Sequence, residues 1–133
     1  YQLAMDLAVK REDRTGLDLF ATAQSNLGTL FYEIGDMANA EGTLQSTLSL
    51  APHFGGAVLN LAHLWNLQGK HVEVVGLIDP MILYGHGSGF TAMGHIYQER
   101  AIALCAYGID EEANKSFDKA TMIDIDISPG ICR

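Results

Sequence analysis

Basic residues are scarce in this sequence: eight Lys and Arg stand against sixteen Asp and Glu, and the formal net charge is −8. No Lys or Arg occurs between Arg14 and Lys70. A nucleic-acid site needs clustered cations that neutralise phosphates, and an anionic membrane surface attracts the same charge. The sequence therefore predicts no nucleic-acid partner and no anionic membrane surface. The acidity indicates solvated helix faces or, as the alternative, a basic partner.

Long hydrophobic runs are also missing. Crossing a membrane takes about 18 to 20 consecutive apolar residues, and the longest candidate, residues 74–84, is interrupted by Gly76, Asp79 and Pro80. The first ten residues carry no basic leader and no small-residue cleavage site, so we expect no signal peptide. We therefore expect no membrane insertion. The 133 residues, 48% of them hydrophobic, suffice for one domain with a core.

Cysteine is limited to Cys105 and Cys132. Two cysteines do not make the framework of a small disulfide-rich domain, so a reducing compartment is favoured, which would mean an intracellular, cytoplasmic location. Cys105 lies within an apolar helical run, and we predict that it is a small buried core residue.

Motifs that carry catalysis or metal binding are absent as well. The sequence has no Walker A loop, no GxGxxG, no HExxH and no CxxC. The segment GHGSG, residues 85–89, lacks the G-x-S-x-G order of a nucleophile elbow and is interpreted as a flexible connection. The five histidines form no helical pair with a third ligand nearby, and residues 110–112 lack the pattern of a calcium loop. We predict no catalytic residue, no metal and no cofactor.

What the sequence does contain is an internal repeat. A shift of 34 positions places residues 26–28 (Asn-Leu-Gly) on residues 60–62 (Asn-Leu-Ala), Phe31 on Trp65, and Gly35 on Gly69. Large residues fall on large ones and glycine falls on glycine. Such a period is typical of proteins built from stacked supersecondary units.

The first unit reads as a helix, a tight turn and a second helix. Leu27, Leu30, Phe31 and Ile34 recur at helical spacing and predict one buried face. Gly35 suits the left-handed conformation after a helix end. In the second helix, the residues expected to point inward are Met37, Ala40, Leu44, Thr47 or Leu48, and Leu50, with Asp36 as the N-cap and Pro52 blocking continuation.

This unit resembles the tetratricopeptide repeat (TPR) family over residues 21–54. The positions that match the family signature are Gln24, Leu27, Gly28, Phe31, Gly35, Ala40, Leu44, Thr47 and Pro52, although Gln24 replaces the usual Trp and Thr47 the usual Ala. The resemblance implies an all-α fold, a right-handed superhelical solenoid of antiparallel helical hairpins.

The flanking units are less regular. In the second unit, residues 55–89, Pro80 should end the helix near Ile78. In the third, residues 90–126, Gly94 and Gly108 are fourteen residues apart instead of seven, which predicts an extended first helix. Residues 1–20 resemble the flanking helix that ends a preceding repeat, with a break at Thr15–Gly16, and residues 127–133 form a tail.

The resemblance also implies a concave groove lined by the first helix of each hairpin. The residues carried onto this groove are Thr22, Ser25, Thr29, Tyr32, Glu33, Leu59, His63, Asn66 and Leu67. Some family members clamp a terminal carboxylate with Lys and Asn. Asn60 matches one such position, but Ser25 and Thr29 occupy the others and no lysine is near. We therefore expect a groove for an extended or helical protein segment with hydrophobic anchors, and no carboxylate clamp.

The sequence thus predicts a non-enzymatic protein–protein interaction scaffold that binds a protein segment or joins a multi-subunit assembly as a neighbouring subunit. One alternative is a regulatory or targeting TPR domain of a larger enzyme whose catalytic part lies elsewhere. A second is a purely structural subunit packed by both faces inside a large complex.

Overall fold

The computed structural model describes residues 14–52, 54–83, 90–124, 126 and 132. All the regular elements in these ranges are α-helices: α2 (Arg14–Glu33), α3 (Met37–Leu50), α4 (Gly55–Leu67), α5 (His71–Leu83), α6 (Phe90–Ala106) and α7 (Asp110–Ile123). The segment GHGSG and His53 lie outside the described residues, as do the first thirteen residues of the expected flanking helix.

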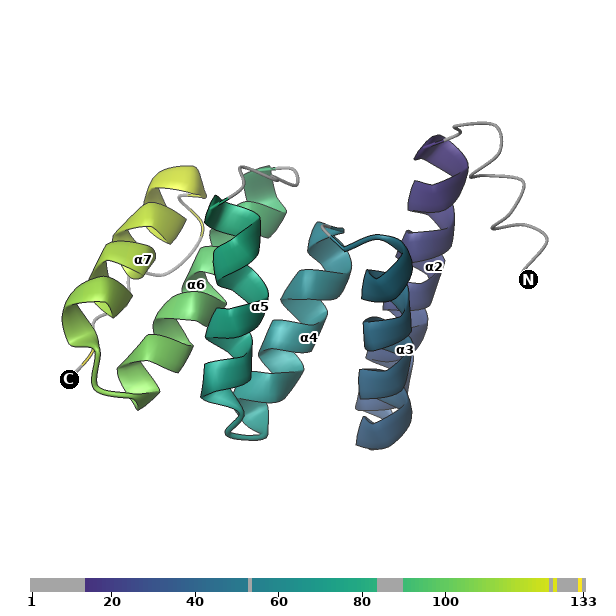
Figure 1. The fold of residues 1–133 in the computed structure, drawn as a ribbon, viewed down its shortest axis with the longest axis horizontal. Coiled ribbons are helices and arrows are strands. Elements are labelled where there is room, and N and C mark those ends of the chain that lie inside the picture. The colour runs from purple at the N-terminus through teal and green to yellow at the C-terminus, as the bar shows by residue number, and fades with distance from the viewer. Residues whose placement is uncertain (1–13, 53, 84–89, 125, 127–131, 133) are drawn as a thin grey trace.

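The helices form an array of antiparallel hairpins, α2 with α3, α4 with α5, and α6 with α7 (Figure 1). Helix α4 contacts α2, α3, α5 and α6, so the middle hairpin joins the two outer ones. Helix α7 contacts only α6 among the described helices. The all-α, TPR-like hairpin architecture expected from the repeat is confirmed.

Three glycines make the turns within the hairpins. Gly35, Gly69 and Gly108 have φ angles of 85°, 78° and 76°, the left-handed region that side chains disfavour. The carboxylate of Asp36 then accepts a hydrogen bond from the Asn39 backbone N–H at 3.2 Å, which caps α3. The predicted turn and cap of the first unit are confirmed.

Replacing the turn glycine Gly69 with Ala should destabilise the protein by roughly 1 kcal/mol, because the left-handed conformation is unfavourable for a residue with a Cβ. Gly42→Ala should act in the opposite direction by up to about 1 kcal/mol, because Gly42 lies inside α3 with open space around its Cβ position. Urea unfolding of both variants shows whether each substitution raises or lowers the free energy of unfolding. Equal effects would contradict this assignment of the turn.

The core consists of two connected clusters of buried residues. One joins α4, α5 and α6 through Val58, Ala62, Val74, Ile78, Met81, Ile96 and Ala103. The other joins α3 and α4 through Ala40, Leu44, Ala57, Leu61 and Leu64, with Phe31 and Tyr32 of α2 packed against it. The half-buried Trp65 packs against both clusters. The apolar repeat positions therefore bury neighbouring hairpins against one another.

Trp65 also makes a polar contact between hairpins. Its indole N–H donates to Glu41 Oε1 at 2.7 Å, and Lys70 Nζ lies 3.3 Å from the same oxygen. The hydrogen bond from Trp65, helped by Lys70, lowers the pKa of Glu41 despite the opposing effect of its burial. This contact therefore stabilises the fold above the ordinary carboxyl pKa, and its contribution is lost as the pH falls through the lowered pKa.

Helix α5 does not end near Ile78, so that prediction is wrong. It continues through Pro80 to Leu83. Proline lacks a backbone N–H and so removes one hydrogen bond from the helix, and Pro80 lies in the last turn, where only three residues of α5 follow it. Met81, only 2% exposed, and Ile82 pack against the core and hold this turn in place.

Helix α2 corrects two further expectations. It runs without interruption from Arg14 to Glu33, so there is no break at Thr15–Gly16, and the repeat boundaries stay a prediction. The apolar stripe is not buried as expected: Leu30 and Ile34 are 56% and 75% exposed. Among the described helices α2 contacts only α3 and α4, and neither covers these two side chains. Among the expected inward residues of α3, Met37 and Leu50 are also exposed.

The cysteine prediction is wrong as well. Cys105 forms a disulfide with Cys132, with 5.4 Å between their Cα atoms and 27 positions between them in sequence. The backbone N–H of Cys132 also donates to Asn114 Oδ1 at 3.0 Å. Cys132 therefore lies beside α6, a proximity that the cysteine count does not reveal. The pairing removes the ground on which a reducing compartment was favoured.

Candidate binding hollow between α2 and α4

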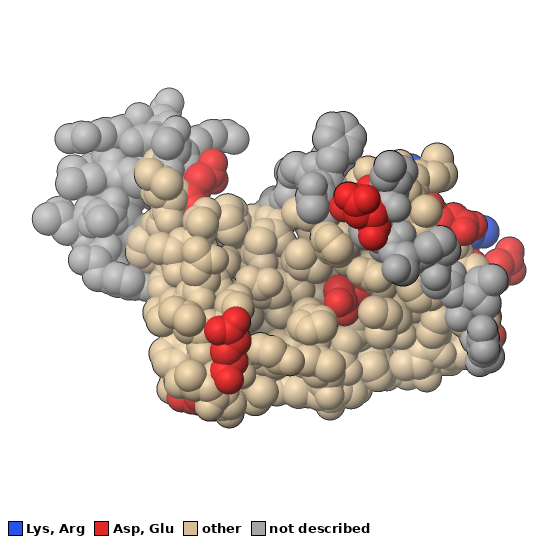
Figure 2. All heavy atoms as spheres, turned by 180° about the vertical axis from the view of Figure 1, so that it is seen from behind, with Lys and Arg blue, Asp and Glu red and all other residues tan. Residues whose placement is uncertain are grey.

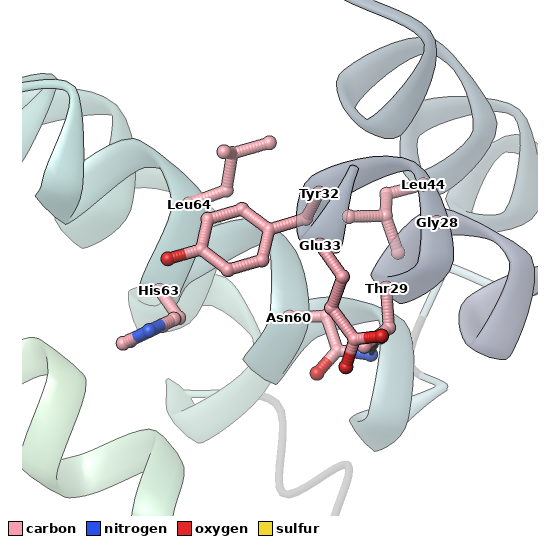
Figure 3. A pocket seen from close by; sticks show the side chains of 8 residues that line it. All are labelled: Gly28, Thr29, Tyr32, Glu33, Leu44, Asn60, His63 and Leu64. Atoms are coloured by element: carbon pink, nitrogen blue, oxygen red, sulfur yellow. Dashed lines mark hydrogen bonds between the residues drawn. The ribbon is translucent and has the colours of Figure 1, made fainter. Parts of the chain in front are cut away.

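A hollow of about 150 Å³ lies between the first helices of the first two hairpins (Figure 3). We call it the α2–α4 hollow. Its lining comprises Gly28, Thr29, Tyr32 and Glu33 from α2, Leu44 from α3, and Asn60, His63 and Leu64 from α4.

Gly28 shapes the floor of the hollow. A Cβ at this position would lie 2.8 Å from Leu44 Cγ, closer than non-bonded carbons approach. The missing side chain thus lets α3 pack against α2 and brings Leu44 beneath the opening. Leu44 and Leu64 are both 2% exposed, so the floor is apolar and held rigidly by the core.

One wall is tied together by a chain of hydrogen bonds. The Asn60 side-chain amide donates to Thr29 Oγ1 at 3.2 Å, and the Thr29 hydroxyl donates to the Ser25 backbone carbonyl at 3.2 Å. This chain joins α4 to α2 across 31 positions of sequence. It holds the Asn60 side chain in one orientation.

The other wall is connected to α6. His63 Nδ1 lies 2.9 Å from Glu99 Oε1, and the Asn66 amide donates to Glu99 Oε2 at 2.8 Å and to the Glu99 backbone carbonyl at 2.9 Å. Glu99 is 7% exposed, so its carboxylate is satisfied by these partners inside the fold. The Tyr32 ring meets the His63 ring edge-on, with 6.2 Å between centroids.

The structure brings four of the nine expected groove residues together in the hollow, namely Thr29, Tyr32, Glu33 and His63. The other five lie outside its lining: Ser25 is buried, Leu59 packs against the core, Asn66 bonds to Glu99, and Thr22 and Leu67 are exposed. Whether these residues bind a partner stays a prediction.

Residues of the hollow that were not among the expected groove positions are Gly28, Leu44, Asn60 and Leu64. For Asn60 the sequence suggested only a position of a carboxylate clamp. Glu99, which contacts His63, was not among the predicted site residues. A signal for it existed, because Glu99 shares the helical stripe of the buried residues Ile96 and Ala103 at spacings of three and four.

The lining of the hollow includes one carboxylate, Glu33, and no Lys or Arg. Three cations elsewhere in the described chain are paired: Lys70 with Glu41 at 3.3 Å, Arg100 with Asp79 at 2.7 Å, and Lys115 with Glu112 at 3.3 Å. Figure 2, which views the molecule from behind, shows acidic side chains scattered over this face, with blue only in the right-hand part. A negatively charged ligand would find no countercharge in the hollow.

Within the described ranges, no group of three His, Cys, Asp or Glu side chains is arranged to hold a metal ion. None of the six described helices is long and apolar enough to cross a membrane.

The sequence matches no family model and no curated protein. Among solved structures, the N-terminal domain of stress-induced protein-1 (STI-1) from C. elegans is similar, with a TM-score of 0.70 over 83% of this chain and 88% of that chain. The two sequences are 17% identical. This likeness shows the fold, a TPR-like helical domain.

Proposed function

We propose that this protein is a non-enzymatic interaction scaffold and that the α2–α4 hollow is where it binds a segment of a partner protein. The occupant is a peptide segment that lays an apolar side chain or side-chain stem on the floor made by Leu44 and Leu64. The observation that carries the proposal is the combination of this buried apolar floor with a rim of polar side chains held in fixed orientations.

Several features support a peptide as the occupant. The hollow is small, so it suits a single side chain rather than a whole cofactor. It opens between two neighbouring helices of a repeat array, where an extended or helical segment could continue along the face. The half-buried Tyr32 and the exposed His63, whose rings meet edge-on, add amphipathic contact area of the kind that dominates binding energy in protein interfaces.

Selection of a phage-displayed random dodecapeptide library on the full chain tests the proposal. We expect enriched peptides that perturb the amide NMR signals of the α2–α4 hollow. Tyr32→Ala should weaken their binding at least about tenfold, equivalent to about 1.4 kcal/mol, because it removes the aromatic wall.

Tyr107→Ala is the matched control, because Tyr107 is an exposed tyrosine that directly follows α6 and lies outside the lining of the hollow. It should leave peptide binding unchanged. Failure to enrich any peptide, or enriched peptides whose binding ignores Tyr32, would refute the proposed site.

A further inference from the structure

The hydrogen-bond chain through Asn60 determines which polar atom the hollow offers to a ligand. The Asn60 amide nitrogen donates to Thr29, whose hydroxyl proton goes to the Ser25 carbonyl. Thr29 thus accepts from Asn60, and the Asn60 amide cannot turn over without losing this bond. Its carbonyl oxygen, Oδ1, accepts no hydrogen bond from within the described chain, so it remains a free acceptor.

Glu99 likewise determines which ring nitrogen of His63 carries the proton. A carboxylate only accepts hydrogen bonds, and its second oxygen already accepts from Asn66. The proton between His63 and Glu99 therefore belongs to Nδ1 of the imidazole. In the neutral ring the other nitrogen, Nε2, is then an acceptor. The His63 side chain is 53% exposed and lines the hollow.

Glu33 supplies the third acceptor and the charge. Its carboxylate lines the hollow, is exposed, and forms no ion pair within the part of the chain that the structure describes. Three of the five polar side chains of the lining, Glu33, Asn60 and His63, thus each offer an acceptor. Of the other two, Thr29 is bonded to Asn60 and Ser25, and the Tyr32 hydroxyl can donate or accept. The net charge of −8 adds a long-range field that attracts cations.

We propose that the side chain received by the α2–α4 hollow is a lysine or arginine of the partner segment. Its aliphatic stem lies over Leu44 and Leu64, and its cationic head donates to Glu33, Asn60 Oδ1 and His63 Nε2. Lys and Arg combine an apolar stem with a head that only donates, which matches this arrangement. The inference rests on the proposed function, because it specifies the occupant of the same site.

Three capped pentapeptides test the proposal by NMR titration of the full chain: Ac-Gly-Ala-Xaa-Ala-Gly-NH2 with lysine, norleucine or glutamate at Xaa. Norleucine keeps an apolar stem similar to that of lysine and lacks the ammonium group. We expect the lysine peptide to bind at least about fivefold more tightly than the norleucine peptide, with shifts at the hollow, and the glutamate peptide to bind most weakly. Higher salt should reduce the preference for lysine.

Glu33→Gln should bring the lysine peptide down to the affinity of the norleucine peptide. Glu73→Gln is the matched control, because it removes the same charge from the exposed surface of α5 and should leave the preference intact. Equal binding of the lysine and norleucine peptides at the hollow would overturn the inference and leave the proposed function standing. No shift at the hollow with any of the three peptides would also overturn the inference, and the library selection then decides the proposed function separately.

Discussion

Reduction of the Cys105–Cys132 disulfide is expected to lower the free energy of unfolding by about 3.5 kcal/mol, as chain entropy predicts for a closed loop of 27 residues. The effect should be large because the loop contains all of α7, whose described helix contacts are with α6 alone. Because α7 packs against a single described helix, it can separate from α6 while the other hairpins stay folded. The disulfide holds Cys132 on α6 and so opposes the separation of α7 from α6.

Urea unfolding followed by circular dichroism, with and without a phosphine reductant, measures the difference. The double variant Cys105→Ser/Cys132→Ser should match the reduced protein and should not respond to the reductant. Hydrogen exchange should locate the loss of protection mainly in α7. A reductant effect below about 0.5 kcal/mol, or loss of protection centred on α2 and α3, would contradict the proposed role of the disulfide.

The hairpin turns could be predicted from the sequence because their cause is local. A left-handed residue after a helix end favours glycine whatever surrounds it, so Gly35 and Gly69 located two turns directly. The N-cap at Asp36 follows the same logic. These positions, together with the repeat of apolar residues, were sufficient to predict the hairpin architecture.

Features that depend on what packs nearby could not be predicted in the same way. Pro80 is tolerated because the turn that contains it buries Met81, a property of the assembled core. Ile34 has the spacing of a buried residue and yet is exposed, because burial requires a neighbouring helix. The disulfide requires that two distant segments meet, which the spacing of the cysteines does not encode.

The candidate site also contains residues that a local pattern predicts and residues that depend on packing. Tyr32 and His63 could be predicted as groove residues because the repeat pattern places them on the first helix of each hairpin. The floor of the hollow could not be predicted, because Leu44 belongs to the second helix of its hairpin. It reaches the hollow only because Gly28 lets α3 pack closely against α2. The orientation of Asn60 and His63 depends on single hydrogen bonds across 31 and 36 positions of sequence.

Glu99→Ala is expected to destabilise the protein by about 2 to 3 kcal/mol. The carboxylate accepts hydrogen bonds from two residues of α4 while being 7% exposed, and charged hydrogen bonds of this kind contribute about 1.5 to 3 kcal/mol. Relief of the desolvation of the carboxylate offsets part of the loss. The loss of its partners still dominates, because Ala leaves His63 without an acceptor and opens a void between α4 and α6.

Urea unfolding of Glu99→Ala measures this loss of stability, and Asp118→Ala is the control. Asp118 is an exposed acid in the middle of α7, so its replacement should change the free energy of unfolding by less than about 0.5 kcal/mol. The isosteric Glu99→Gln should retain most of the stability, since its amide oxygen still accepts one bond. It should nevertheless weaken the preference for the lysine peptide, because an amide nitrogen facing His63 makes Nδ1 the acceptor and Nε2 the donor. A stable Glu99→Gln protein with an unchanged preference for lysine would show that Nε2 of His63 does not contact the cation, and would confine its recognition to Glu33 and Asn60.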